Sequence, residues 1–143
     1  MAQCRCIQKK FEKFFKLKNI IIWEKNNTSM GDLKASYAPK HEFVLYGNKG
    51  RRFLEGFRHC DIVKAKRTGN KLHPTQKPVQ LLEFFIKNSS KEGDIIIDPF
   101  MGSGSTGIAC LNTNRKFIGI ELDNNYFEVA KRRIEEHQPK GSD

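Results

Sequence analysis

The chain has 143 residues, of which 38% are hydrophobic and 29% are charged, and its formal net charge is +10 at pH 7. This length fits a single domain, which we take as residues 1–143. No apolar run is long enough to span a bilayer and no apolar segment follows the first residues as in a signal peptide, so we expect a cytoplasmic protein with no membrane contact.

The N-terminal third predicts one helix and two strands. Residues 7–16 carry apolar side chains near helical spacing with lysines between them, which favours an amphipathic helix. Residues 18–24 and 42–47 suit strands, and the polar stretch 25–41, with a glycine and a proline, suits a loop. We expect the two strands to form an antiparallel edge pair, with Trp23 packed in the core.

Residues 48–72 are basic and have poor periodicity. They belong to a half of the chain, residues 1–71, that holds 17 basic and 6 acidic residues, an excess of 11, whereas residues 72–143 hold 9 and 10. A basic half beside a neutral half is typical of a polyanion-binding surface next to a small-molecule pocket. A merely solvated basic surface explains the same imbalance equally well, so charge alone leaves both open.

A strand, a glycine-rich turn and a helix are predicted in the second half, after an apolar helix at Val79 to Ile86. Ile95 to Ile97 are β-branched, which favours a strand, and the stretch Ile108 to Leu111 fits a helix. The turn between them contains Gly102, Gly104 and Gly107. Glycine permits positive φ and the close approach of a ligand to the backbone, so this pattern indicates a mononucleotide-binding unit.

The next predicted strand, residues 116–120, ends in Glu121, which is placed to accept hydrogen bonds from a ribose. The glycines with Glu121 also match the dinucleotide pattern of nicotinamide-dependent oxidoreductases. Asp98-Pro99 disfavours that alternative, because its carboxylate faces the space that two phosphates would occupy. An acid at this strand tip suits a cationic group such as an ammonium or a sulfonium. A glycine turn without any ligand is the remaining alternative.

The last predicted element is a helix from Asn124 to His137. Asp123 is a plausible N-cap, because its carboxylate can accept hydrogen bonds from the free N–H groups of the first turn. Within this helix, one apolar stripe should face inward and three basic side chains should face water. The stripe is Phe127, Ala130 and Ile134, and the basic residues are Lys131, Arg132 and Arg133.

The cysteines do not predict a metal site. Cys4 and Cys6 are not at a common zinc spacing, and no matching pair of cysteines or histidines occurs elsewhere. We expect free, reduced thiols and no bound metal.

Three motifs occur in a telling order: HPTQKP at residues 73–78, DPFMGSGSTG at 98–107 and FIGIELDNNYFEVAKRRI at 117–134. In this order they resemble the permuted β group of DNA amino-methyltransferases. The resemblance covers nearly the whole chain and implies an α/β, Rossmann-like sheet of an S-adenosylmethionine-dependent methyltransferase. It divides the chain into edge strands and a helix at 1–47, a short basic target-recognition segment at 48–72 and a cofactor-binding part at 73–137.

The resemblance implies S-adenosylmethionine as the cofactor. Asp98 and the glycine turn would hold its methionine end, Glu121 its ribose hydroxyls, and Phe100 with Leu122 its adenine or thioether. The segment before the apolar helix would close the methionine side, where a lysine suits the carboxylate of the cofactor. The implied cofactor-binding residues are Thr75, Lys77, Pro78, Asp98, Phe100, Gly102, Ser103, Gly104, Thr106, Glu121 and Leu122.

The resemblance implies double-stranded DNA as the partner. The implied activity is DNA methylation, typically as part of restriction–modification. The methyl group would pass to an exocyclic amine of a flipped base, with adenine N6 favoured over cytosine N4. Cations in the basic segment could neutralise phosphates, and an arginine could contact guanine in the major groove. The DNA-binding candidates are Lys49, Arg51, Arg52, Arg58, Lys64, Lys66 and Arg67.

The motif that does the chemistry in this family, Asp/Asn/Ser-Pro-Pro-Tyr/Phe, is absent. No Pro-Pro dipeptide occurs in the chain. We therefore expect the C-terminal part of such an enzyme, with no catalytic residue of its own and without the central strand that precedes the motif. We expect the chain to be inactive alone, and either a second polypeptide supplies the missing part, or the sheet closes differently, or the sequence is a gene fragment. The alternative is a non-catalytic remnant that binds cofactor and DNA.

Overall fold

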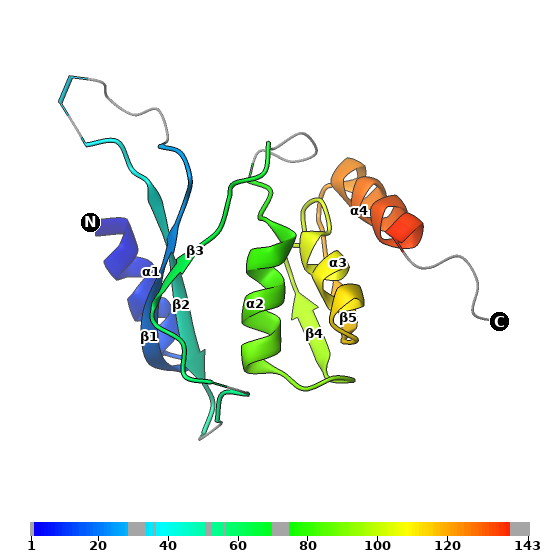
Figure 1. Ribbon diagram of the computed structural model, residues 1–143, viewed down its shortest axis with the longest axis horizontal. Coiled ribbons are helices and arrows are strands. Elements are labelled where there is room, and N and C mark those ends of the chain that lie inside the picture. The colour runs from blue at the N-terminus through cyan, green and yellow to red at the C-terminus, as the bar shows by residue number, and fades with distance from the viewer. Residues whose placement is uncertain are drawn as a thin grey trace. The chain divides into compact units, whose positions relative to one another are not determined.

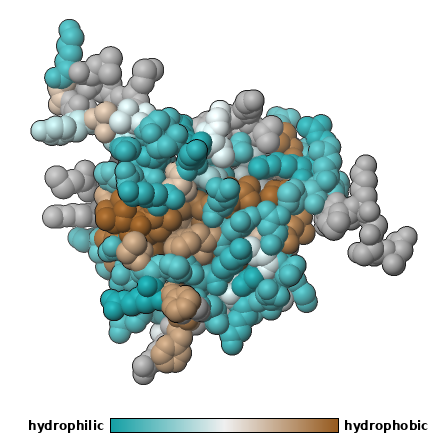
Figure 2. Space-filling view, in the orientation of Figure 1, coloured by the Kyte–Doolittle hydropathy of each residue, from teal (hydrophilic) through white to brown (hydrophobic). Residues whose placement is uncertain are grey.

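A computed structural model describes residues 2–28, 34–35, 37–50, 53–55, 57–69 and 75–137 (Figure 1). The chain divides into two compact units. The first contains Met1–Phe53 and Arg58–Lys66, and the second contains Leu54–Phe57 and Arg67–Asp143. Both units carry patches of hydrophobic surface among hydrophilic side chains (Figure 2). None of the described helices has the length and apolar character that crossing a membrane requires.

The first unit consists of α1 (Ala2–Glu12) and a sheet of β1 (Lys16–Glu24), β2 (His41–Asn48) and β3 (Ile62–Lys64) in the order β2-β1-β3. The predicted antiparallel pairing of β1 with β2 is confirmed. The sequence did not predict β3, which pairs with β1 in parallel. The predicted helix at 7–16 starts and ends earlier than expected, because the chain turns after Glu12 and Lys16 already pairs with Asn48.

Trp23 anchors β1 to the segment that follows β3. Its side chain is only 2% exposed, as the core prediction requires, and its indole N–H donates to the carbonyl of Ala65 at 2.9 Å. The N–H of Ala65 in turn donates to the carbonyl of Glu24 at 3.2 Å. An indole N–H that is buried needs such a partner, and this one fixes a segment 42 residues away in the sequence.

The second unit contains α2 (Val79–Ser89), β4 (Ile95–Asp98), α3 (Ser105–Asn112), β5 (Lys116–Gly119) and α4 (Asn124–His137). The predicted strand–turn–helix–strand unit is confirmed, with β4 and β5 paired in parallel. Its core joins Ile86 of α2 to Ala109 and Cys110 of α3, and Ile96 and Phe117 pack against this cluster from the two strands.

The opposite face of the β4–β5 sheet is uncovered. Ile95, Ile97, Ile118 and Ile120 are 58%, 62%, 48% and 56% exposed, respectively. Within the described ranges, β5 is also the only strand paired with β4, so one edge of β4 is open. Parallel sheets are normally covered on both faces. The expectation of a partial sheet is therefore confirmed.

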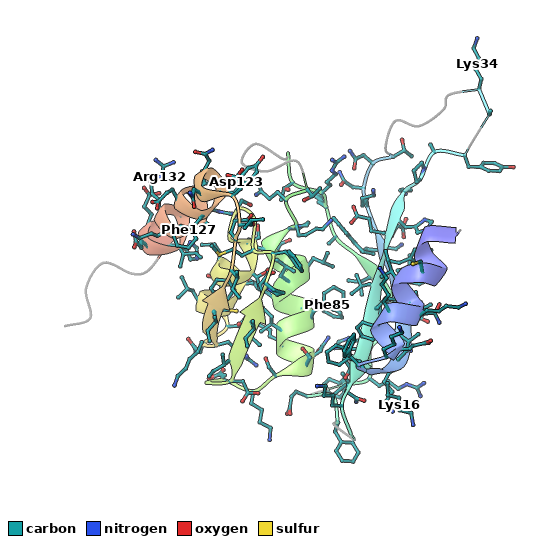
Figure 3. All side chains as sticks on the ribbon, turned by 180° about the vertical axis from the view of Figure 1, so that it is seen from behind. Lys16, Lys34, Phe85, Asp123, Phe127 and Arg132 are labelled. Carbon is teal, nitrogen blue, oxygen red and sulfur yellow. The ribbon has the colours of Figure 1, made fainter. Side chains whose placement is uncertain are left out.

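The bounds of α4 match the prediction, and its capping is confirmed. The carboxylate of Asp123 accepts hydrogen bonds from the backbone N–H groups of Asn125 at 2.8 Å and Tyr126 at 3.1 Å. Ala130 is fully buried, whereas Phe127 is 38% exposed. Figure 3 shows Asp123 at the start of α4 and Arg132 on its outer side.

The expectation that Arg133 faces water is wrong. Its guanidinium donates to the backbone carbonyl of Ser103 at 2.9 Å and to the hydroxyl of Ser105 at 3.1 Å. Burial lowers the pKa of Arg133. The charge pattern placed this side chain outside, but its position three residues after the buried Ala130 puts it on the inner side of the helix.

We predict that Cys110 resists alkylation while the exposed Cys6 and Cys60 react. Cys110 is 0% exposed, and burial raises the pKa of its thiol to about 11, which suppresses the reactive thiolate. Iodoacetamide labelling of the native protein, followed by peptide mass spectrometry, measures each site. Labelling in urea is the control and should reach Cys110 together with the other three cysteines of the chain. A native rate for Cys110 equal to that of Cys6 would show that the core of the second unit is not formed.

Candidate functional site

Two carboxylates stand at the tips of the neighbouring parallel strands β4 and β5. Asp98 ends β4 opposite Gly119, and Glu121 follows two residues later. The segment between β4 and α3 returns to β5, since the N–H of Met101 donates to the carbonyl of Ile120 at 3.0 Å. Parallel pairing thus brings two acids that are 23 positions apart in the sequence to one end of the sheet.

Two of the three glycines predicted in the turn after β4, Gly102 and Gly104, have the expected backbone conformation, whereas Gly107 lies within α3. Gly102 has a φ of 52° and Gly104 a φ of 75°, values that side chains other than glycine rarely adopt. The turn is also tightly packed, because a Cβ at Gly104 would lie 3.0 Å from the Cβ of Ala130 in α4. All residues from Met101 to Ser105 are buried.

Glu121 holds this turn directly. One of its carboxylate oxygens accepts the N–H of Gly102 at 2.8 Å, and the other accepts the N–H groups of Leu122 at 3.0 Å and Asp123 at 3.1 Å. Backbone N–H groups therefore already orient both carboxylate oxygens of Glu121.

Asp98 is also engaged within the turn. It accepts the N–H of Phe100 at 3.0 Å and the hydroxyl of Thr106 at 2.5 Å. Thr106 is therefore more than a first-turn residue of α3, because it fixes the orientation of the acid. These two donors to Asp98 are neutral, so its negative charge is left to attract a cationic group.

The remaining predicted cofactor residues lie in three places. Ser103 is buried within the turn, whereas Phe100 and Leu122 are 87% and 96% exposed beside the two acids. Pro78 is buried at the start of α2, where its carbonyl accepts the N–H groups of the first helical turn. Thr75 and Lys77 lie in the segment leading to it, and the preceding residues His73 and Pro74 lie outside the described residues.

The predicted DNA-binding residues do not form one cluster. Lys49 lies near the beginning of β1, with its ammonium 5.6 Å from the ring of Phe15, whereas Lys64 pairs with Glu24 at the opposite end of β1. Nine residues of strand separate these ends by about 25 Å. Arg58, Lys66 and Arg67 are exposed, the last in the second unit. Arg51 and Arg52 lie outside the described residues.

Acidic residues neutralise part of the charge at the carboxyl end of β1. Lys40 lies 3.1 Å and Lys64 lies 3.6 Å from carboxylate oxygens of Glu24. The hydrogen bond from Lys40 and the nearby charge of Lys64 lower the pKa of Glu24. The buried ammonium of Lys25 lies 3.6 Å from Glu42. Lys64 is thus less available to a phosphate than the sequence suggested.

Comparison with known proteins identifies the family to which the chain belongs. The family model described as DNA methylase, of the N6/N4 type, matches residues 56–132, which is more than half of the chain. The chain belongs to this DNA methylase family. It is 35% identical to the protein in a crystal structure of an M1.HpyAVI–SAM complex, with a TM-score of 0.78, covering 91% of this chain and 68% of the other.

Curated relatives include type II methyltransferases. Over 139 residues the chain is 33% identical to M2.DpnII of Streptococcus pneumoniae, covering 85% of this chain and 52% of the relative. Over 147 residues it is 35% identical to M2.MboI of Moraxella bovis, covering 90% and 53%, respectively. The chain therefore spans about half the length of the curated relatives it matches.

Proposed function

We propose that this chain is the cofactor-binding and DNA-contacting part of a site-specific DNA methyltransferase domain, located in the cytoplasm. The reaction would move a methyl group from S-adenosylmethionine to an exocyclic amine of a flipped base, with adenine N6 favoured. The observation that carries the proposal is the pair of acids, Asp98 and Glu121, on either side of the buried glycine turn. Membership of the DNA methylase family and the SAM in the M1.HpyAVI structure support it.

The residues present fit the methyl donor. The carboxylate of Asp98, held by Thr106, would face the ammonium of the methionine moiety, and Glu121 would accept hydrogen bonds from the ribose hydroxyls. The exposed Phe100 and Leu122 offer apolar surface to the adenine. Lys77 would face the carboxylate of the cofactor, with Thr75 and Pro78 beside it. When bound, the cofactor supplies an electrophilic methyl group on a sulfonium.

We further propose that a second segment completes the enzyme. The open edge of β4 supports a site for an additional strand, and the exposed isoleucines on the face of the β4–β5 sheet support an element that packs on this face. The chain also lacks the Pro-Pro motif that would accept the hydrogen bonds of the target amine. One segment that contains both the strand and the motif, supplied by a second polypeptide, would meet both needs. The alternative proposal is a non-catalytic module that binds cofactor and DNA.

The cofactor assignment is tested at Glu121. We expect the chain to bind S-adenosylmethionine and not NAD, and Glu121→Gln to weaken binding by about 1–3 kcal/mol, because one acceptor oxygen becomes a donor. Isothermal titration calorimetry measures both affinities. Glu128→Gln, an exposed change on α4, is the matched control. Equal affinities of wild type and Glu121→Gln would remove Glu121 from the pocket.

The DNA-contacting role is tested by salt dependence. Replacing both Arg58 and Lys66 by alanine should flatten the slope of log K against log salt concentration by about 0.9 per lost phosphate contact. Fluorescence anisotropy with a labelled duplex at several salt concentrations measures this slope. Lys91→Ala, an exposed change in the second unit, should leave it unchanged. A slope that the double variant does not alter would make these two cations merely solvated.

Activity should require the missing segment. We expect no methyl transfer by this chain alone, because correct placement of the amine accounts for up to about 7–11 kcal/mol of the barrier. The assay is transfer of a tritiated methyl group to duplex DNA. It is run with and without a co-expressed segment, the added half, that carries the strand and the Pro-Pro motif.

Turnover only with the added half would support the split enzyme. A version of the added segment with its Pro-Pro motif replaced by Ala-Ala is the control and should be inactive. Turnover by the chain alone would contradict the proposal and direct attention to the loop at residues 25–41. If neither preparation turns over while both bind cofactor, the non-catalytic alternative is favoured.

A further inference from the structure

Arg133 reaches from α4 to the back of the glycine turn. Its Nη1 lies 2.9 Å from the carbonyl oxygen of Ser103, 3.1 Å from the hydroxyl of Ser105 and 3.4 Å from the hydroxyl of Ser103. These two serines are themselves only 3% and 5% exposed. The guanidinium is therefore inserted among buried atoms of the turn, whereas the neighbouring Arg132 is exposed.

This position is unfavourable for a cation if stability is the only criterion. Ser105 begins α3, and the N-terminus of a helix carries a partial positive charge that repels a cation. The partners of the guanidinium are neutral oxygens, and burial lowers the pKa of Arg133. An apolar side chain would avoid the cost of removing this charge from water. The arginine therefore contributes something that an apolar residue does not.

Arg133 fixes the backbone of the glycine turn at a second position. Glu121 accepts the N–H of Gly102, and Arg133 donates to the carbonyl of the next residue, Ser103. Two side chains of opposite charge thus hold consecutive residues of the backbone. Glu121 lies just beyond the end of β5, and Arg133 belongs to α4. Between them the turn packs closely on α4, because even a Cβ added at Gly104 would lie 3.0 Å from the Cβ of Ala130.

We propose that Arg133 is a positioning residue for the methyl donor: it holds the Ser103 carbonyl and the Ser105 hydroxyl so that the glycine turn keeps the shape that receives the cofactor. The proposal rests on the proposed function, because the turn is the cofactor site in it. Arg133 acts through the turn and does not itself contact the cofactor. Without Arg133, the turn would become mobile next to Glu121. Binding of the cofactor would then have to order the turn again.

The test compares Arg133→Met, Arg133→Lys and the matched control Arg132→Met. Calorimetry gives the affinity of each for S-adenosylmethionine at a temperature at which circular dichroism shows all of them folded. Arg133→Met should bind about ten-fold more weakly, because a hydrogen-bonded charge is lost. Arg133→Lys keeps a cationic donor and should recover part of the affinity, and Arg132→Met should bind as the wild type does.

Hydrogen exchange without cofactor separates positioning from general destabilisation. In Arg133→Met the amides of residues 102–105 should exchange faster, while those of residues 108–111 in α3 should keep their wild-type rates. Unchanged affinity of Arg133→Met would overturn the positioning role. Faster exchange in the turn and in α3 to the same degree would overturn it too, because the residue would then be merely structural. A wild-type chain with no affinity for S-adenosylmethionine would instead overturn the proposed function and this inference with it.

Discussion

The hydrogen bond from the N–H of Gly102 to the carboxylate of Glu121 is the interaction on which the candidate site depends. It joins the turn after β4 to the residue beyond the tip of β5, at 2.8 Å, and it requires the parallel pairing of the two strands to bring them together. It also satisfies a buried backbone donor, whose loss would cost about 1–3 kcal/mol. The same contact therefore serves folding and the shape of the pocket.

A consequence is that the pocket is largely formed before any ligand arrives. Three backbone N–H groups orient Glu121, and Phe100 with Thr106 orients Asp98. A ligand that meets fixed acceptors loses less entropy on binding than one that must order them. The turn thus preorganises the proposed donor site. The described residues do not preorganise a surface for the target base in the same way.

Local features of the sequence predicted much of the second unit. The β-branched run, the glycines and the Asp123 cap determine β4, the turn and the start of α4 through interactions between near neighbours. The strand β3 could not be predicted, because three residues of weak pattern become a strand only where β1 offers an edge. The partners of Glu121 and Arg133 were missed for the same reason, since both are set by residues 19 and 30 positions away.

The distribution of apolar surface supports the same separation between the residues that would hold the methyl donor and the motif that would hold the acceptor amine. The exposed isoleucines of the β4–β5 sheet lie on the face that the helical core does not cover. A face of this kind costs free energy in water, about 25 cal/mol for each Å² that could be buried. The chain tolerates this cost in the unit that would hold the methyl donor, and it lacks the motif that would hold the acceptor amine. A strand added to the open edge of β4, as proposed, would lie beside the tip where Asp98 begins the proposed donor site, and would bring the motif that follows it to the methyl donor.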